Sequence, residues 1–200
     1  MEQPQLNDHN KQEYPPMHTT EPSTQVNNNI EIYKKGLEPW VGKNPKVLIL
    51  GTMPGDESIR QQVYYANTSK NSFWKIMYSL FSKKENQNNK EFIISQNIAL
   101  WDCAKFGIRK NSTDREYNFD TIKPNDIYYF LEQHPTIKVI ILNGKGKGSK
   151  KSPSTPYMFK KFFFHKELNC QVRKLSSTSN SYGNGMKLEE WSIIKELVKV

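Results

Sequence analysis

The sequence predicts a three-layer α/β/α fold around a central, mostly parallel sheet of four strands. Two runs of branched and aliphatic residues, 47–50 and 139–142, end at Gly51 and at Asn143-Gly144. Continuous apolar runs of this length are typical of strands that are buried on both faces. Helical stretches lie between the strand candidates, and strands that alternate with helices form parallel sheets.

The other elements are expected from weaker patterns. Residues 98–101 and 171–175 are further strand candidates, the second nearer an edge of the sheet. Helices are expected over residues 71–81, 88–96, 125–133, 155–168 and 187–200. Asn71 and Asn125 stand where helix N-caps belong.

The first 29 residues differ in composition from the rest of the chain. They are rich in Asn, Gln, Pro and Thr and contain hardly any aliphatic residues, so they cannot bury enough surface to offset the entropy of ordering. We therefore expect a disordered tail over residues 1–29 and one folded domain over residues 30–200.

The charge of the folded part favours a polyanionic partner. The chain of 200 residues has 29 Lys and Arg against 20 Asp and Glu, a net charge of +9. Residues 1–30 hold one Lys and four acids, so the remainder carries about +12. A body this basic gains free energy when it neutralises phosphates and releases counterions.

Composition also excludes several classes of protein. No apolar stretch approaches the roughly 18 to 20 residues that span a bilayer. Two cysteines, Cys103 and Cys170, cannot form a disulfide scaffold or a four-cysteine metal site. The first residues lack the apolar segment of a secretory signal, and the acidic, Arg-free tail differs from a mitochondrial presequence. We expect a reduced intracellular protein of the cytoplasm or nucleus that is not secreted.

The turn after the first apolar strand is the first place to look for chemistry. In parallel sheets, ligands bind beyond the carboxyl ends of the strands. The turn consists of Gly51, Thr52, Met53, Pro54 and Gly55, and its two glycines allow the backbone to approach a ligand closely. Taken alone, the same residues fit an ordinary connection between a strand and a helix.

The motifs that follow this turn carry a family resemblance. Ser58, the triplet 64–66 (Tyr-Tyr-Ala) and the quartet 71–74 (Asn-Ser-Phe-Trp) come within about 20 residues of the turn. With the turn, they resemble the uracil-DNA glycosylase superfamily, most closely its hypoxanthine (deoxyinosine) DNA glycosylase branch. The resemblance covers about residues 40–195 and continues through 100–102, 124–126, 134–135, 143–145 and 175–179.

This resemblance implies a DNA-repair enzyme that works without a cofactor or metal. Its substrate would be DNA with a deaminated base, hypoxanthine first and uracil second, that is flipped out of the helix before its glycosidic bond is hydrolysed. The turn 51–55, Tyr65 and Phe73 would form the base pocket, with Tyr65 stacking on the base. A core aromatic residue is the structural alternative for Tyr65.

Three residues are candidates for the catalytic machinery. Asn143 matches an Asn that contacts the base, and an amide can stabilise the departing base anion; an Asn-Gly turn is its structural alternative. Asn71 is the second candidate, unless it only caps a helix. Met53 stands where many members of the superfamily have a water-orienting Asp or Asn. Asp114 ends a segment, 111–114, that resembles the branch's G-S-L-D motif with its glycine and leucine replaced. The resemblance makes Asp114 the third candidate, as the water activator, although a surface turn also explains it.

DNA contacts are expected from two loops and one hydroxyl. Residues 175–180 resemble the family's loop that enters the minor groove, with Ser176 and Asn180 in place of its prolines. A basic stretch, 143–174, has nine Lys and Arg against one acid. Both loops could also be ordinary solvated loops. The expected DNA-binding residues are Ser58, Lys145, Lys147, Ser177, Thr178 and Ser179.

Two other functions remain open at this point. The missing acid at Met53 and the substituted loop positions also fit a catalytically weak or inactive nucleic-acid-binding relative. A small-molecule α/β enzyme, such as a nucleotide hydrolase, is a third hypothesis. For the glycosylase we expect a monomer that acts on DNA and not at a membrane.

Overall fold

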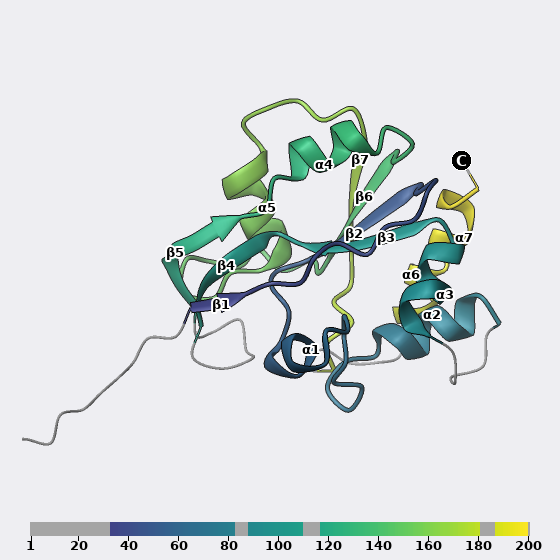
Figure 1. Cartoon of the computed structure of the whole chain (residues 1–200), viewed down its shortest axis with the longest axis horizontal. Helices are drawn as coiled ribbons and strands as arrows, with labels where there is room; N and C mark the ends of the chain where they lie inside the picture. The colour runs from purple at the N-terminus through teal and green to yellow at the C-terminus, as the bar shows by residue number, and fades with distance from the viewer. Residues whose placement is uncertain (1–32, 83–87, 110–116, 181–186, 200) are drawn as a thin grey trace, which may run out of the picture. The chain divides into compact units, whose positions relative to one another are not determined.

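The computed structural model describes residues 33–82, 88–109, 117–180 and 187–199 (Figure 1). Residues from Glu31 onward cluster as one compact unit, and this unit contains all the described elements. The tail expected over residues 1–29 and the candidate Asp114 lie outside the described residues. No helix among the described residues has the length and hydrophobicity that a bilayer span requires.

The central sheet has four parallel strands, as the sequence predicts. They are β2 (Val47–Gly51), β3 (Ile98–Asp102), β6 (Val139–Asn143) and β7 (Gln171–Leu175), in the order β3-β2-β6-β7. β7 is an edge strand, also as expected. The pairing places Gly51 beside Asp102, and Asn143 beside Leu175. The carboxyl ends of all four strands therefore meet at one edge of the sheet.

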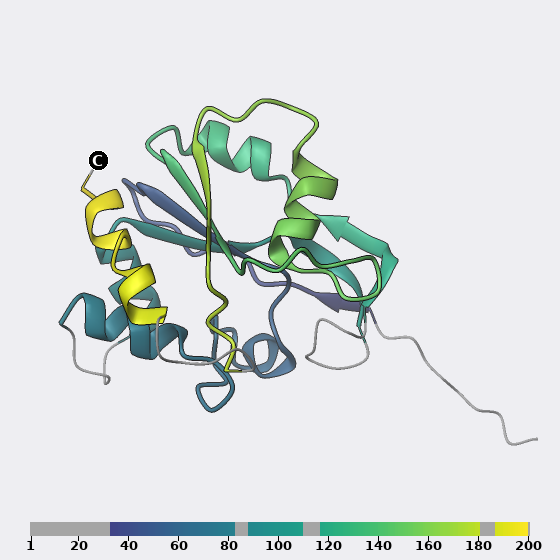
Figure 2. The same ribbon diagram turned by 180° about the vertical axis from the view of Figure 1, so that it is seen from behind.

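Helices cover both faces of this sheet, which confirms the three-layer arrangement (Figures 1 and 2). One face carries α2 (Phe73–Leu80), α3 (Asn89–Ser95), α6 (Lys187–Trp191) and α7 (Ile194–Leu197), and the other carries α4 (Ile127–Gln133) and α5 (Thr155–Phe163). Alternate residues of β2 point to opposite faces, so Val47 and Ile49 join one core whereas Leu48 and Leu50 join the other.

A second sheet was not expected from the sequence. It is antiparallel and consists of β1 (Tyr33–Lys35), β4 (Ala104–Arg109) and β5 (Tyr117–Pro124), in the order β1-β4-β5. β4 follows β3 almost directly, so this sheet extends from the edge of the central sheet where the carboxyl ends lie. A short helix, α1 (Asp56–Gln61), follows the turn 51–55 and was also not expected.

Some expected helix boundaries are wrong. The helix expected over 155–168 ends at Phe163, and the next residue, Phe164, is 75% exposed, so the apolar face stops there. The helix expected over 187–200 is two short helices. They are interrupted at Ser192, whose hydroxyl donates to the carbonyl of Glu189 and competes with the helical hydrogen bonds.

The two expected N-caps are also wrong, for different reasons. Ser72, not Asn71, is the N-cap of α2, although the Asn71 side chain accepts a hydrogen bond from the amide of Phe73 at 2.9 Å. Asp126 caps α4. The side-chain Nδ2 of Asn125 instead donates to the main-chain carbonyl of Asp102 at 2.8 Å, so Asn125 supports the carboxyl end of β3.

Candidate functional site

The site is built around Gly51, the last residue of β2. A Cβ atom at this position would lie 2.4 Å from Oδ1 of Asp102 and 3.6 Å from the hydroxyl of Tyr65. The first distance is far below van der Waals contact, so only glycine lets the Asp102 carboxylate pack against this turn. The absence of a side chain at Gly51 thus brings Asp102 and Tyr65 together.

Asn143 and Tyr65 share this site. The amide Nδ2 of Asn143 donates to the hydroxyl of Tyr65 at 3.1 Å and to the hydroxyl of Thr178 at 2.9 Å. Its Oδ1 accepts from the main-chain N–H of Thr178 at 2.9 Å. These bonds join the loop that carries Tyr65 to the loop that carries Asn143. Both N–H groups of the Asn143 amide are occupied by protein partners, so contact with another molecule requires an exchange of hydrogen bonds.

Tyr65 is held in a defined orientation. Its backbone is left-handed, with φ of 55°, and its ring stacks on Phe73 with centroids 4.0 Å apart and planes inclined by 22°. Phe73 is fully buried, so it supports Tyr65 from below and does not itself line an open pocket. Burial raises the pKa of the Tyr65 hydroxyl well above its ordinary value, and the charge of Asp102 adds to the shift. The hydroxyl therefore stays protonated at neutral pH.

Asp102 is a site residue that sequence reasoning missed. Asp102 is only 4% exposed. Burial raises the pKa of the Cys103 thiol, and the charge of Asp102 raises it further, as it does for Tyr65. The motif 100–102 was part of the family resemblance, but no role followed from it. The available signal was an acid at the end of an apolar strand that pairs with the strand before the glycine turn.

The loop 176–180 lies between Asn143 and Asn71. On one side, Thr178 bonds to Asn143 as described. On the other, the amide of Ser72 donates to the carbonyl of Thr178 at 2.8 Å, and Asn71 pairs with Ser179 as an isolated antiparallel bridge. The loop therefore places Asn71 next to the Tyr65–Asn143 cluster, although no direct contact joins Asn71 to Asn143 in the hydrogen bonds of the described residues.

Helix α6 holds the same loop from outside through residues at positions i, i+3 and i+4. Lys187 donates to the carbonyl of Ser179 at 2.6 Å, and the indole of Trp191 donates to the carbonyl of Ser176 at 2.9 Å. Glu190 accepts from the amide and the hydroxyl of Ser176, at 3.0 and 2.5 Å. Side-chain bonds thus brace the loop at Ser176, where the resembled family has a proline.

Several expected DNA-binding side chains serve a structural role. Ser58 is buried and accepts from the amide of Ala66 at 3.2 Å, so it fixes the loop that carries Tyr65. Thr178 is fully buried, which makes its hydroxyl a support for Asn143 and not a free phosphate donor. Lys145 is exposed but forms an ion pair with Glu190 at 2.7 Å.

The remaining expected residues lie where solvent reaches them or in the turn itself. Lys147 is exposed, and Ser177 and Ser179 are part-buried. In the turn, Thr52 and Gly55 are part-buried, whereas Met53 and Pro54 are buried. The Met53 side chain packs in the core beside α4 and α5, so it has no access to a reacting water.

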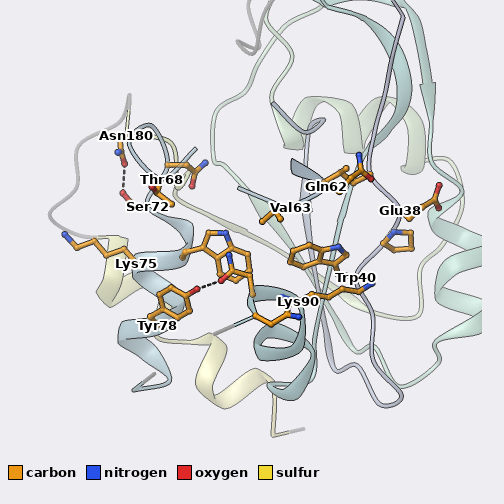
Figure 3. Close-up of a pocket in the computed structure, with 16 residues that line it drawn as sticks. Glu38, Trp40, Gln62, Val63, Thr68, Ser72, Lys75, Tyr78, Lys90 and Asn180 are labelled. Carbon is orange, nitrogen blue, oxygen red and sulfur yellow. Dashed lines mark hydrogen bonds between the residues drawn. The ribbon is translucent and has the colours of Figure 1, made fainter. Parts of the chain in front are cut away.

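A cavity lies on the far side of the loop 176–180 from Asn143, next to Asn71 and Ser72 (Figure 3). It has a volume of about 980 Å³ and is lined by Asn71, Ser72 and Asn180 on the side of the loop 176–180. Lys75 and Lys90 add two cations to its lining, and Figure 3 shows both at the helical side of the cavity. Tyr65 and Asn143 are not among its lining residues; Ser72, which bonds to Thr178, and Asn71, which pairs with Ser179, connect its lining to the loop 176–180.

The described residues contain no group of three or more His, Cys, Asp or Glu that could hold a metal ion. The polar groups of the site are instead an amide, hydroxyls, a carboxylate and main-chain N–H groups. This set can hydrogen-bond a planar heterocycle through both donors and acceptors.

Comparison with known proteins gives concordant matches. The model of the uracil DNA glycosylase superfamily matches residues 39–188. A hypoxanthine DNA glycosylase of Methanosarcina barkeri is 33% identical over 119 residues, which cover 58% of this chain and 73% of that protein. A second hypoxanthine DNA glycosylase, from Methanosarcina acetivorans, is 32% identical over 119 residues, which again cover 58% of this chain and 73% of that protein.

A solved structure agrees with these matches. It is the solution NMR structure of a Methanosarcina acetivorans protein named as a uracil DNA glycosylase. The TM-score is 0.64 at 26% sequence identity, and the match covers 83% of this chain and 99% of that chain.

Proposed function

Because the chain belongs to the uracil DNA glycosylase superfamily, we propose that its substrate is a hypoxanthine base flipped out of DNA, with uracil as the second base. The chain is a DNA glycosylase, a hydrolase of N-glycosyl bonds. The choice of hypoxanthine rests on the two relatives that are named for this base. The observation that carries the proposal is the hydrogen-bonded cluster of Tyr65, Asn143 and Thr178 at the carboxyl ends of the sheet.

In this proposal Asn143 exchanges one partner when the base enters. Its Nδ2 leaves the Tyr65 hydroxyl and donates to the base, while Thr178 keeps the amide in place through the bond to Oδ1. The base leaves with negative charge, so a positioned donor lowers the barrier. Tyr65 stacks on the base with the ring face that Phe73 does not cover.

Asp102 supplies selectivity for deaminated bases. Hypoxanthine and uracil both carry a ring N–H next to a carbonyl, whereas adenine and cytosine present an acceptor nitrogen at the corresponding position. A buried carboxylate beside Gly51 accepts from the ring N–H and repels the acceptor nitrogen. Asp114 lies outside the described residues and remains the proposed water activator, with Asn71 as a second catalytic group next to the loop 176–180.

The exposed groups near the cluster are proposed to contact the DNA backbone. Lys147, Ser177 and Ser179 are accessible to different degrees, and Lys145 becomes available when its ion pair with Glu190 opens. We propose that the enzyme acts as a monomer inside the cell, in the cytoplasm or nucleus. We also propose that residues 30–200 form the catalytic domain, without need of the tail 1–29.

The test is base release from labelled duplexes that contain one deoxyinosine, one deoxyuridine, or adenine at the same position. Alkali converts abasic sites to strand breaks, which a denaturing gel resolves. The proposal expects a break at deoxyinosine, a weaker one at deoxyuridine and none at adenine. Salt-sensitive binding of the duplex without any break would favour the inactive relative. Release of base from free deoxyinosine but not from DNA would favour a small-molecule hydrolase.

A further inference from the structure

Arg109 is a buried cation with no counterion among the described residues. It is the last residue of β4 and only 2% exposed. None of the ion pairs in the described part of the chain includes it, and no described group accepts a hydrogen bond from its Nε. A buried guanidinium is costly unless hydrogen bonds satisfy it, so the described partners of Arg109 show what its position stabilises.

The guanidinium is aimed at the turn after β2. Its Nη1 donates to the carbonyl of Met53 at 3.4 Å, and its Nη2 donates to the carbonyl of Pro54. Tyr117 on β5 supports the group from the other side, through its hydroxyl at 2.9 Å and its ring face at 5.1 Å. The Arg109 side chain therefore connects the far end of β4 to this turn.

The carbonyls of residues 51–54 all accept hydrogen bonds from the same side of the turn, two of them from Arg109. The amides of Cys103 and Ala104 donate to the carbonyls of Gly51 and Thr52, each at 2.9 Å. Together with the two bonds of Arg109, every carbonyl from residue 51 to 54 points toward the β3–β4 side. In a trans peptide the N–H points opposite to the carbonyl, so the amides of this turn point away from the second sheet.

Two of these amides are without an acceptor in the described part of the chain. Neither the N–H of Met53 nor that of Gly55 donates to any described group. Amides that are held in place without a protein acceptor form a site for an anion. The peptide between Pro54 and Gly55 is also polarised, because a cation holds its oxygen.

We propose that Arg109 is a positioning residue of the glycosylase reaction, which presents the Met53 and Gly55 amides to the departing base and favours the base as an anion. This inference rests on the proposed function. In the reaction, the oxygen of water bonds to the C1′ carbon as the bond from C1′ to the base nitrogen breaks. The bonding pair leaves with the base, and the proton released by the water later neutralises that anion.

The test compares Arg109→Met and Arg109→Lys with Arg60→Met. Arg60 is an exposed arginine on α1 that pairs with Glu57, so it controls for loss of one positive charge near the turn. Each full-length protein is assayed for single-turnover release of hypoxanthine from a duplex and for duplex affinity by fluorescence anisotropy. Inhibition by free hypoxanthine is also measured below and above the pH at which that base loses its proton.

The proposal expects Arg109→Met to reduce the rate about 10- to 100-fold with the duplex Kd within about twofold. Arg109→Lys keeps the charge and should lose about 3- to 10-fold. Wild-type protein should be inhibited more strongly by the hypoxanthine anion than by the neutral base, and Arg109→Met should lose this preference. Arg60→Met should match the wild type in every measurement.

Other outcomes overturn the inference. An unchanged rate in both Arg109 variants does so, as does wild-type inhibition that is independent of the charge of hypoxanthine. If circular dichroism shows that Arg109→Met does not fold, Arg109→Lys decides by the same criteria. A wild-type protein that releases no base refutes the proposed function and this inference with it, whereas an active wild type with unaffected variants refutes only the role of Arg109.

Discussion

Asn143→Asp is the substitution that best separates the chemistry of Asn143 from its structural role. An aspartate has nearly the same shape and retains an oxygen for the amide of Thr178. The hydroxyls of Tyr65 and Thr178, which accept from Asn143 in the native protein, can rotate and donate to the new carboxylate. The change therefore preserves the hydrogen-bond network but removes the donor that the base anion needs.

The structure gives the expected magnitudes. Asn143→Ala leaves the amide of the fully buried Thr178 without an acceptor, at about 1–3 kcal/mol, and removes two further bonds of about 1 kcal/mol each. A total of about 3–5 kcal/mol lowers the Tm by roughly 6–20 °C. Asn143→Asp should lose only about 1 kcal/mol of stability. Base release should fall about 100- to 1000-fold in both variants.

The assay is single-turnover release of hypoxanthine from a duplex, with Tm measured on the same preparations. Asn118→Asp, an exposed position on β5, controls for the added negative charge on DNA binding. If Asn143→Asp released hypoxanthine at a rate within about threefold of the wild type, Asn143 would not donate to the base, and the proposed exchange of partners would be wrong.

Two further predictions follow from the same geometry. Gly51→Ala should destabilise the protein by about 1–3 kcal/mol and reduce base release at least about tenfold, because its Cβ would displace the Asp102 carboxylate. The control is Gly146→Ala, whose Cβ would lie 3.9 Å from the nearest atom, so stability and base release should stay unchanged. If the two variants lost the same stability and activity, the packing at Gly51 would not be the cause. Burial raises the pKa of Glu190, but hydrogen bonds from Lys145 and Ser176 outweigh this and lower it overall. Its stabilising contribution should therefore be complete above its ordinary pKa and disappear as the pH falls through the lowered pKa. Glu190→Gln should reduce the Tm near neutral pH but not in acid well below that lowered pKa. Glu189→Gln, at an exposed position, is the control, and a Tm difference that persisted unchanged in acid would contradict the assignment.

The central sheet could be predicted because its inner strands have a simple sequence pattern. Each of the strands that contain Val47 and Val139 is buried on both faces, and such strands have uninterrupted apolar runs. Tyr65 and Asn143 could be proposed because the motifs 64–66 and 143–145 resemble those of the superfamily, and Asn143 also ends an apolar strand of this sheet.

The strands of the second sheet have no such sequence pattern. β4 contains Gly107, and its pairing with β5 shifts register twice, so neither strand shows the regular alternation that predicts an antiparallel pair. The role of Arg109 was hidden for the same reason, since a buried arginine depends on partners distant in sequence. Asp102 was visible in a motif, but its contact with Gly51 depends on the register between two strands, which a single sequence does not specify.

Side-chain hydrogen bonds from α6, and not a covalent ring, restrain the loop 176–180, so the restraint depends on solution conditions. A proline restrains the backbone through its covalent ring, and such a restraint does not respond to salt or acidity. In this chain the loop depends instead on Lys187, Glu190 and Trp191, and the Glu190 part is also coupled to Lys145. Salt that screens the pairing of Glu190 with Lys145, or acid that protonates Glu190, would therefore weaken the hold of α6 on the loop 176–180.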